Sequence, residues 1–104
     1  MDIIKNNIIR ILNNYKTFYI YNINNYWKSF GYNRDGQCGV GSNERIINKP
    51  IIFYEGEIFE WKFYNNAIFI RFKNNVWKSF GANYIGQCGI VSDEEKINKP
   101  TTFL

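Results

Sequence analysis

The chain has 104 residues, of which 45% are hydrophobic and 21% charged, as expected for one small globular domain and not for a wholly disordered chain. Its net charge of +4 comes from singly spread basic residues, with no block typical of nucleic-acid-binding tails. No apolar run approaches the roughly twenty residues of a membrane-spanning helix, and the N-terminus lacks a signal-peptide core. We therefore expect an intracellular protein, cytoplasmic or nuclear, without membrane contact.

The counts of histidine and cysteine narrow the chemistry further. The chain has no histidine and two cysteines, so the four ligands of a typical zinc site are not available. Catalytic arrangements of Ser-His-Asp or Cys-His type are excluded, because each of them needs a histidine. A disulfide-stapled secreted miniprotein would need a higher cysteine density. We expect neither a metal nor a cofactor.

The first half of the chain predicts four short strands. They span residues 8–12, 18–23, 26–30 and 50–54, with turns at Asn13-Asn14 and Asn24-Asn25. Residues 2–12 also place isoleucines at helical spacing, but the internal repeat described below aligns residues 8–12 with a strand of the second half. We therefore predict a strand there.

The second half predicts the same series of elements. Its strands span residues 58–63, 67–72, 76–80 and 100–103, with turns at Asn65-Asn66 and Asn74-Asn75. In the first of these strands Phe59, Trp61 and Phe63 alternate with charged residues, which is the period-two pattern of a half-buried strand. Pro100 is predicted to open the last strand, where no ladder donor is needed.

An internal repeat with an offset of fifty residues dominates the sequence. Trp27-Lys28-Ser29-Phe30-Gly31 returns as Trp77-Lys78-Ser79-Phe80-Gly81, and seventeen of the twenty-eight positions in 27–54 are identical in 77–104. A period of about fifty residues is typical of propeller and solenoid repeats.

A glycine-rich loop separates the third and fourth strands of each unit. In the first unit it spans residues 31–49 and contains four glycines within eleven residues. Such density indicates positive φ angles or close backbone approach. A phosphate-binding loop would instead lead into a helix and carry Lys-Ser or Lys-Thr, so we expect these glycines to let the loop of one unit pack on the next.

The segment from Phe30 to Gly41, followed by Pro50, resembles the repeat of the regulator-of-chromosome-condensation family. That repeat reads aromatic-Gly-x-Asn-x-x-Gly-Gln-apolar-Gly-x-Gly, with a proline after a short loop. The second copy departs from it at Val91, and both copies have phenylalanine for the usual tryptophan and cysteine for the usual leucine. The structural motif residues are Trp27, Gly31, Asn33, Gly36, Gln37, Cys38, Gly39 and Pro50, and in the second copy Trp77, Gly81, Asn83, Gly86, Gln87, Cys88, Gly89 and Pro100.

The resemblance implies an all-β fold of two antiparallel four-stranded β-propeller blades. Residues 1–54 would form the first blade and 55–104 the second, together one partial propeller domain. Family members usually close a ring of seven blades, and two blades cannot close one. The chain is therefore a fragment of a longer propeller, a subunit that closes a ring as a homo-oligomer, or a short homologue. A start at Met1 and a stop at Leu104, within a strand, favour a short or truncated product.

The cysteines and tryptophans have structural explanations. Cys38 and Cys88 occupy equivalent positions in neighbouring units, which we expect to lie beyond the roughly 7 Å Cα limit of a disulfide. We predict two buried thiols in a leucine-like slot. Trp27, Trp61 and Trp77 are expected to pack in the core or between blades, not to stack on nucleic-acid bases.

Three classes of function compete. A non-enzymatic protein-interaction module is favoured, because propeller loops form a rigid rim for binding. The resemblance also implies a guanine-nucleotide exchange regulator of a small GTPase, or a chromatin- or nucleic-acid-associated factor. An enzyme is disfavoured, because the acidic groups at Glu55, Glu57 and Glu60 and at Asp93, Glu94 and Glu95 look like solvated charges.

Positions that differ between the two copies are our candidates for partner binding. Tyr32, Arg34 and Asp35 stand opposite Ala82, Tyr84 and Ile85 within otherwise matching motifs. Because the packing of the repeat does not fix these positions, we expect Tyr32, Arg34, Asp35 and Tyr84 to contact a protein partner.

Overall fold

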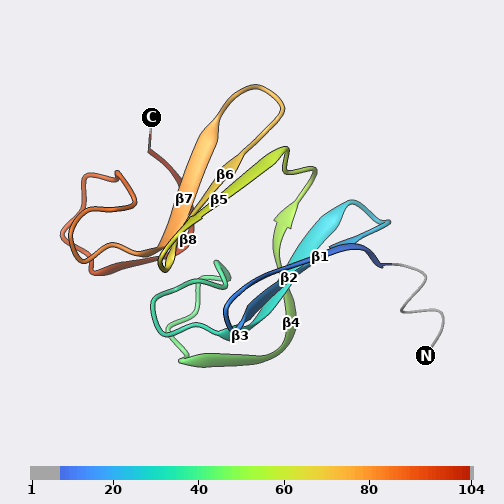
Figure 1. The fold of residues 1–104 in the computed structure, drawn as a ribbon, viewed down its shortest axis with the longest axis horizontal. Helices are drawn as coiled ribbons and strands as arrows, with labels where there is room; N and C mark the ends of the chain where they lie inside the picture. The colour runs from blue at the N-terminus through green and yellow to red at the C-terminus, as the bar shows by residue number, and fades with distance from the viewer. Residues whose placement is uncertain (1–7, 104) are drawn as a thin grey trace.

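The computed structural model describes residues 8–103, and all of its regular elements are strands. Eight strands form two antiparallel four-stranded sheets in the orders β1-β2-β3-β4 and β5-β6-β7-β8 (Figure 1). The first sheet comprises β1 (Ile8–Asn14), β2 (Thr17–Asn22), β3 (Tyr26–Tyr32) and β4 (Ile46–Glu55). The second comprises β5 (Glu60–Tyr64), β6 (Ala67–Arg71), β7 (Trp77–Ala82) and β8 (Lys96–Thr102). The all-β prediction of two four-stranded blades is confirmed.

The predicted turns agree with the structure except for the first. Asn25, Asn65 and Asn75 have φ angles of 69°, 55° and 64°, which asparagine tolerates better than most residues. The turn predicted at Asn13-Asn14 is wrong, since both residues pair with β2 and the hairpin reverses at Tyr15 and Lys16. Tyr15 itself takes the left-handed φ of 66°.

The sequence predicted that Pro50 and Pro100 begin their strands, and the structure shows that they do not. β4 begins at Ile46 and β8 at Lys96, so each proline lies inside a strand. In the first sheet Gly31 pairs with Ile47 and Ser29 with Ile51, which leaves a bulge around Pro50. The same shift separates the pairs Gly81–Ile97 and Ser79–Thr101 around Pro100. A bulge tolerates proline because its extra residue donates no ladder hydrogen bond.

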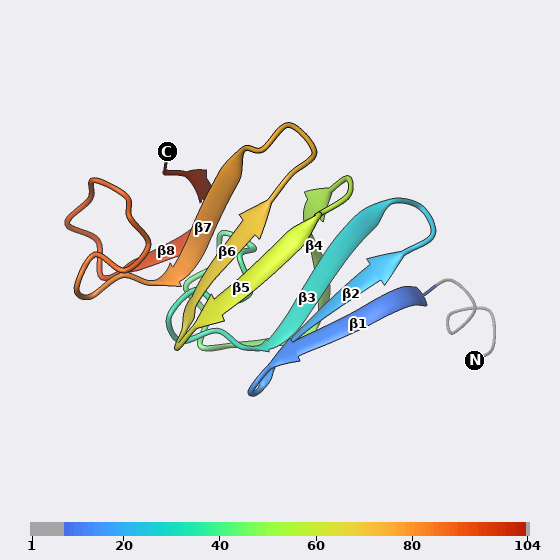
Figure 2. The ribbon, with the colours of Figure 1, turned by 45° about the horizontal axis from the view of Figure 1, so that its top comes forward.

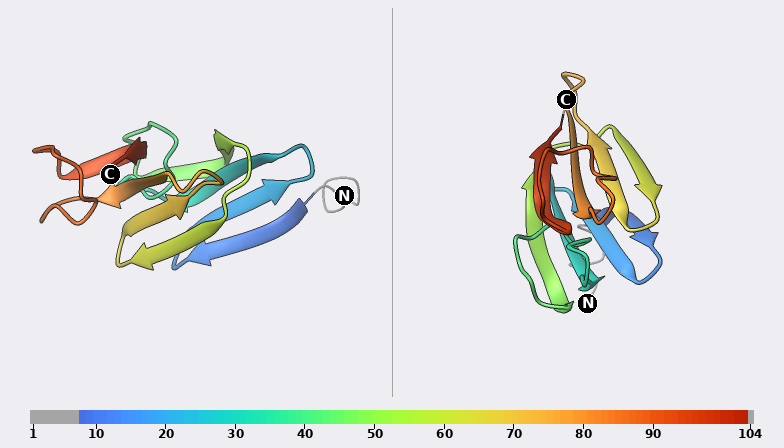
Figure 3. Two further views of the ribbon diagram at one scale, coloured as in Figure 1. Left: turned by 90° about the horizontal axis from the view of Figure 1, so that it is seen from above. Right: turned by 90° about the vertical axis from the view of Figure 1, so that its left-hand side faces the viewer.

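The two sheets stack face to face, and the core lies between them (Figures 2 and 3). Strand pairing puts Tyr19 and Trp27 on one face of the first sheet, opposite the second-sheet face that carries Ile68, Ile70 and Phe80. All five side chains are buried. Trp61 joins the layers, with ring centroids 4.9 Å from Tyr19 and 5.0 Å from Trp27. The prediction that tryptophans pack between blades is thus confirmed for Trp27 and Trp61.

Candidate functional site

Two long loops form the candidate site, and the repeat motif folds each of them. Residues 33–45 join β3 to β4, and residues 83–95 join β7 to β8. In the first loop the Asn33 side chain donates to the carbonyls of Ser42 and Glu44 and accepts from the Cys38 amide at 2.9 Å. The Gln37 side chain accepts from the Asp35 amide at 2.7 Å. One buried asparagine and one glutamine therefore hold the loop in shape.

The second loop repeats most of these hydrogen bonds. Asn83 donates to the Glu94 carbonyl and accepts from the Cys88 amide, and Gln87 accepts from the Ile85 amide at 2.9 Å. Ser79 below the loop donates to the Cys88 carbonyl at 2.7 Å, as Ser29 does to Cys38. These motif residues thus stabilise the conformation of their own loop in both copies.

The glycines bring the first loop onto the second sheet. A Cβ on Gly36 would lie 2.9 Å from backbone atoms of Ile97 and Asn98, and one on Gly39 would lie 3.0 Å from the Phe80 ring. The Gly41 amide donates to the Asn98 carbonyl at 2.7 Å. The loop of the first unit therefore packs on the second, as the glycine content predicted.

The structure brings Arg34, Asp35 and Tyr84 together between the two loops. Arg34 and Tyr84 are exposed, whereas Tyr32 is half-buried at the end of β3. Asp35 is only 6% exposed, and its carboxylate accepts hydrogen bonds from the Asn66 amide and the Tyr84 hydroxyl. The premise that packing leaves Asp35 free is therefore wrong, because this carboxylate links the two blades. Whether these residues contact a partner stays a prediction.

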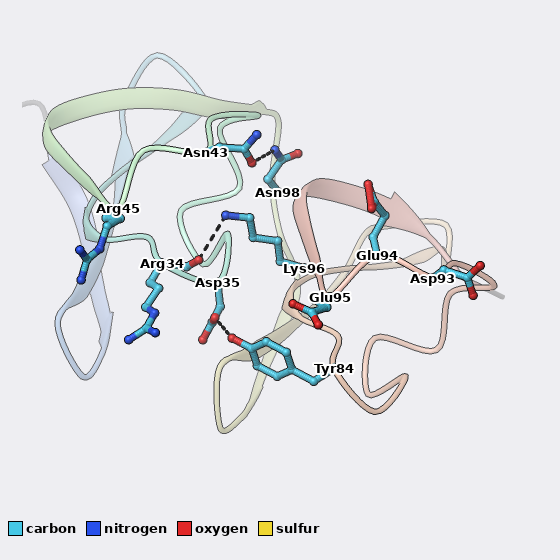
Figure 4. A pocket seen from close by; sticks show the side chains of 10 residues that line it. All are labelled: Arg34, Asp35, Asn43, Arg45, Tyr84, Asp93, Glu94, Glu95, Lys96 and Asn98. Atoms are coloured by element: carbon cyan, nitrogen blue, oxygen red, sulfur yellow. Dashed lines mark hydrogen bonds between the residues drawn. The ribbon is translucent and has the colours of Figure 1, made fainter.

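A polar groove of about 1010 Å³ lies between the loops (Figure 4). Lys96 reaches across it to the Arg34 carbonyl at 3.4 Å, and Asn98 donates to the Asn43 side chain at 3.0 Å. The groove is lined by Arg34, Asp35, Asn43, Arg45, Tyr84, Asp93, Glu94, Glu95, Lys96 and Asn98. Basic groups come from the first loop and β8, and exposed acidic groups come from the second loop.

Sequence reasoning missed several residues of this groove. Arg45 and Lys96 also differ from their counterparts, which are Glu95 and Ile46. The comparison of copies that selected Arg34 would have found both, had it been extended through the loop to the first residue of the following strand. Asp93 to Glu95 were seen only as solvated charges, and the structure does leave them exposed while placing them at the groove.

The two thiols are structural. Cys38 and Cys88 are free and fully buried, as predicted. Burial raises the pKa of Cys38 from 9.0 to about 12, against an opposing effect of the hydrogen bond with Ser29. Burial likewise raises the pKa of Cys88. Because the thiolate is the nucleophile and metal ligand, both groups are poor candidates for either role.

Within residues 8–103, no three His, Cys, Asp or Glu side chains gather in a way that could hold a metal ion. The same residues include no helix long and apolar enough to cross a membrane.

The comparisons with known proteins rest on structure. The sequence matches no known family profile and no curated protein. Prp20p from Saccharomyces cerevisiae superimposes with a TM-score of 0.78 at 19% identity, over 92% of this chain and 26% of that one. The chain folds as two blades of an RCC1-type propeller. Human WBSCR16 matches with a TM-score of 0.77 at 16% identity, over 93% of this chain and 25% of its own.

A third match is a chain of the complex of Kap60 with yeast RCC1 (Prp20), with a TM-score of 0.70 at 23% identity, over 91% of this chain and 22% of that one. The chain thus spans about a quarter of the length of the RCC1-type structures that it matches. The resemblance seen in the repeat motif is confirmed at the level of the fold.

Proposed function

We propose that the chain is a non-enzymatic protein-interaction module that binds a protein partner in the groove between residues 33–45 and 83–95. The groove itself is the observation that carries the proposal. It is polar, and its lining includes the basic residues Arg34, Arg45 and Lys96 as well as the acidic residues Asp93, Glu94 and Glu95. Such mixed charge suits a protein segment with charges of both signs, because electrostatic complementarity sets the orientation of binding.

The chemistry of the described residues supports a role without catalysis. The thiols are buried and their pKa values are raised, which disfavours the nucleophilic thiolate. The hydrogen bond from Arg71 holds the pKa of Glu60 below its ordinary value, so this carboxyl is a poor general acid at neutral pH. An intracellular address, cytoplasmic or nuclear, belongs to the same proposal.

The partner is proposed from the structural neighbours. The structure of Prp20p is described together with its binding properties to Gsp1p and histones. We therefore propose a small GTPase or a histone as the first partners to test, with regulation of nucleotide exchange or chromatin association as the alternative function. Nucleic acid itself is the weaker candidate, because Asp93 to Glu95 would repel phosphates from one side of the groove.

The test measures binding of the chain to immobilised Gsp1p and to core histones. Arg45→Glu reverses a groove charge, and Lys73→Glu makes the same change at an exposed position in the β6–β7 turn, outside the groove. We expect Arg45→Glu to weaken binding about tenfold or more, which is typical of an interface arginine, and Lys73→Glu to leave it unchanged. Equal weakening by both variants would contradict the groove, and no binding would contradict both partners.

Two further measurements separate the alternatives. Release of a fluorescent guanine nucleotide from Gsp1p would reveal exchange activity, and no acceleration would contradict it. Affinity for duplex DNA that falls steeply with salt would indicate phosphate contacts, because counterions are released on binding. A flat response would contradict nucleic-acid binding.

A further inference from the structure

At the junction between the two blades, one side of the first blade packs on one side of the second. The first blade contributes a donor side, made of the buried face with Tyr19 and Trp27 and of the loop 34–41. The second blade contributes an acceptor side, made of Ile68, Ile70, Phe80 and the segment 96–99. Each side is buried by the other.

The first blade also has an acceptor side, and the second blade also has a donor side. Neither of these sides contacts another blade among residues 8–103. The acceptor positions of the first blade are Phe18, Ile20 and Phe30, which are half-buried, whereas their counterparts in the second blade are 0% exposed. Ile11 stands where the second blade has Trp61 and is 61% exposed. The donor face of the second blade likewise leaves Phe69 and Trp77 half-buried, at the positions of Tyr19 and Trp27. Both faces thus keep apolar surface in contact with solvent.

The residues of the two free sides match those of the filled junction. The donor segment Gly36-Gln37-Cys38-Gly39 returns unchanged as residues 86–89. The acceptor segment Ile97-Asn98-Lys99-Pro100 has the same sequence as residues 47–50, where Asn48 and Lys49 are exposed. Gly86 keeps a φ of 76° with nothing within 4 Å of an added Cβ, whereas Gly36 meets the backbone of Ile97 and Asn98.

Charge adds a reason for the free sides to meet one another. Where the filled junction pairs Asn43 with Asn98, the free sides would bring Asp93 against Asn48, which precedes Lys49 in the chain. An amide and an ammonium are both donors to a carboxylate. The basic excess also lies in the first half, with seven Lys or Arg against three acids in residues 1–52. The acidic loop of one chain therefore faces the more basic blade of another.

We propose that a second copy of this chain seats its first blade on the second blade of the first copy. This interface lies on the outer sides of the two blades and goes beyond the proposed function, and it shares only Arg34 and Asp93 with the lining of the groove. The contact is head to tail, and such contacts close into a ring when the rotation permits. Three or four copies would supply about six or eight blades, within the range of roughly 4–8 in known propellers. The assembly is therefore a ring of three or four chains.

The first test is the absolute mass of the 104-residue chain by light scattering over a wide concentration range. The expected mass is three or four times the 12.4 kDa of one chain. A mass of 12.4 kDa at every concentration would overturn the proposal and leave the free sides to another protein.

A matched pair of variants locates the contact. Ile85→Lys and Ile23→Lys both replace an exposed isoleucine by lysine, at positions 87% and 55% exposed. The counterpart of Ile85 is Asp35, which is buried at the filled junction, whereas the counterpart of Ile23 is Lys73, which stays exposed there. In the ring Ile85 would meet Lys16 and Arg34, the counterparts of Asn66 and Tyr84.

We expect Ile85→Lys to reduce the mass to that of one chain, because like charges repel across the contact, and Ile23→Lys to keep the ring. Circular dichroism checks that both variants keep their strands. An unchanged mass for Ile85→Lys would overturn the proposed surface, and so would an equal loss of mass in Ile23→Lys. Carbodiimide cross-linking gives an independent result, since a link between Asp93 and Lys49 should occur only in bands larger than one chain. Its absence from a wild-type ring would also overturn the proposed surface.

Discussion

The loops 33–45 and 83–95 share a motif and internal hydrogen bonds, yet they have different surroundings. Asparagine and glutamine side chains close both loops in the same way. Asp35 in the first loop is 6% exposed, whereas Ile85 at the same place in the second is 87% exposed. The motif thus determines the shape of the loop, and a neighbouring blade determines its burial. Substitutions at paired positions separate these two contributions to stability.

The largest difference is expected between Trp27 and Trp77. Trp27 is 1% exposed and packs on Tyr21 and Trp61, whereas Trp77 lies half-buried on the free face. Trp27→Ala should lower the free energy of unfolding by about 3–5 kcal/mol, the usual cost of removing a large core side chain. Trp77→Ala should cost about 1–2 kcal/mol, nearer to the average substitution. Urea unfolding followed by circular dichroism, at a protein concentration low enough to keep the chain a monomer, measures both, and equal losses there would contradict the assignment of the buried face.

Gly36 and Gly86 separate backbone strain from contact between blades. Both have positive φ, so alanine at either position should cost about 1 kcal/mol in strain. Gly36→Ala should cost about 1–3 kcal/mol more, because its Cβ would lie 2.9 Å from the backbone of the second blade. Comparison of the two unfolding midpoints in urea, at a protein concentration low enough to keep the chain a monomer, tests this. A loss for Gly86→Ala as large as that for Gly36→Ala would mean that the contact contributes nothing.

Asp35 and Ile85 test the polar link between the blades. Asp35→Ala leaves the Tyr84 hydroxyl and the Asn66 amide without their acceptor, which should lower the free energy of unfolding by about 1–3 kcal/mol. Ile85→Ala should stay within about 0.5 kcal/mol, because its side chain is exposed. Thermal unfolding at low protein concentration compares the two variants, and a neutral Asp35→Ala would contradict the link.

The strands could be predicted from the local sequence pattern, whereas the propeller architecture was implied by the resemblance of the repeat motif. Alternation of apolar and charged side chains predicted the strands of the second copy. The internal repeat then indicated the same strands in the first copy. Pairing was harder to predict, since the bulges at Pro50 and Pro100 depend on the register against the preceding strand. The role of Asp35 was missed for a related reason. Its partners Asn66 and Tyr84 are remote in sequence, and a comparison of copies cannot show that a residue which differs contacts the next blade.

The last expected effect depends on pH and on the buried thiols beneath both loops. Burial raises the pKa of Cys38 from 9.0 to about 12, so the folded chain keeps a proton that the unfolded chain loses. This contribution to stability is complete below about pH 9 and decreases as the pH rises toward 12, by about 1.4 kcal/mol per pH unit for one group. Urea unfolding at pH values on either side of 9 should show the decrease. Cys38→Val keeps an apolar side chain without the thiol and should reduce the slope to the part contributed by Cys88, whose pKa is also raised. An unchanged slope in Cys38→Val would mean that the thiol beneath the first loop is solvated, and the contact between the loop and the second blade would then not exclude water from it.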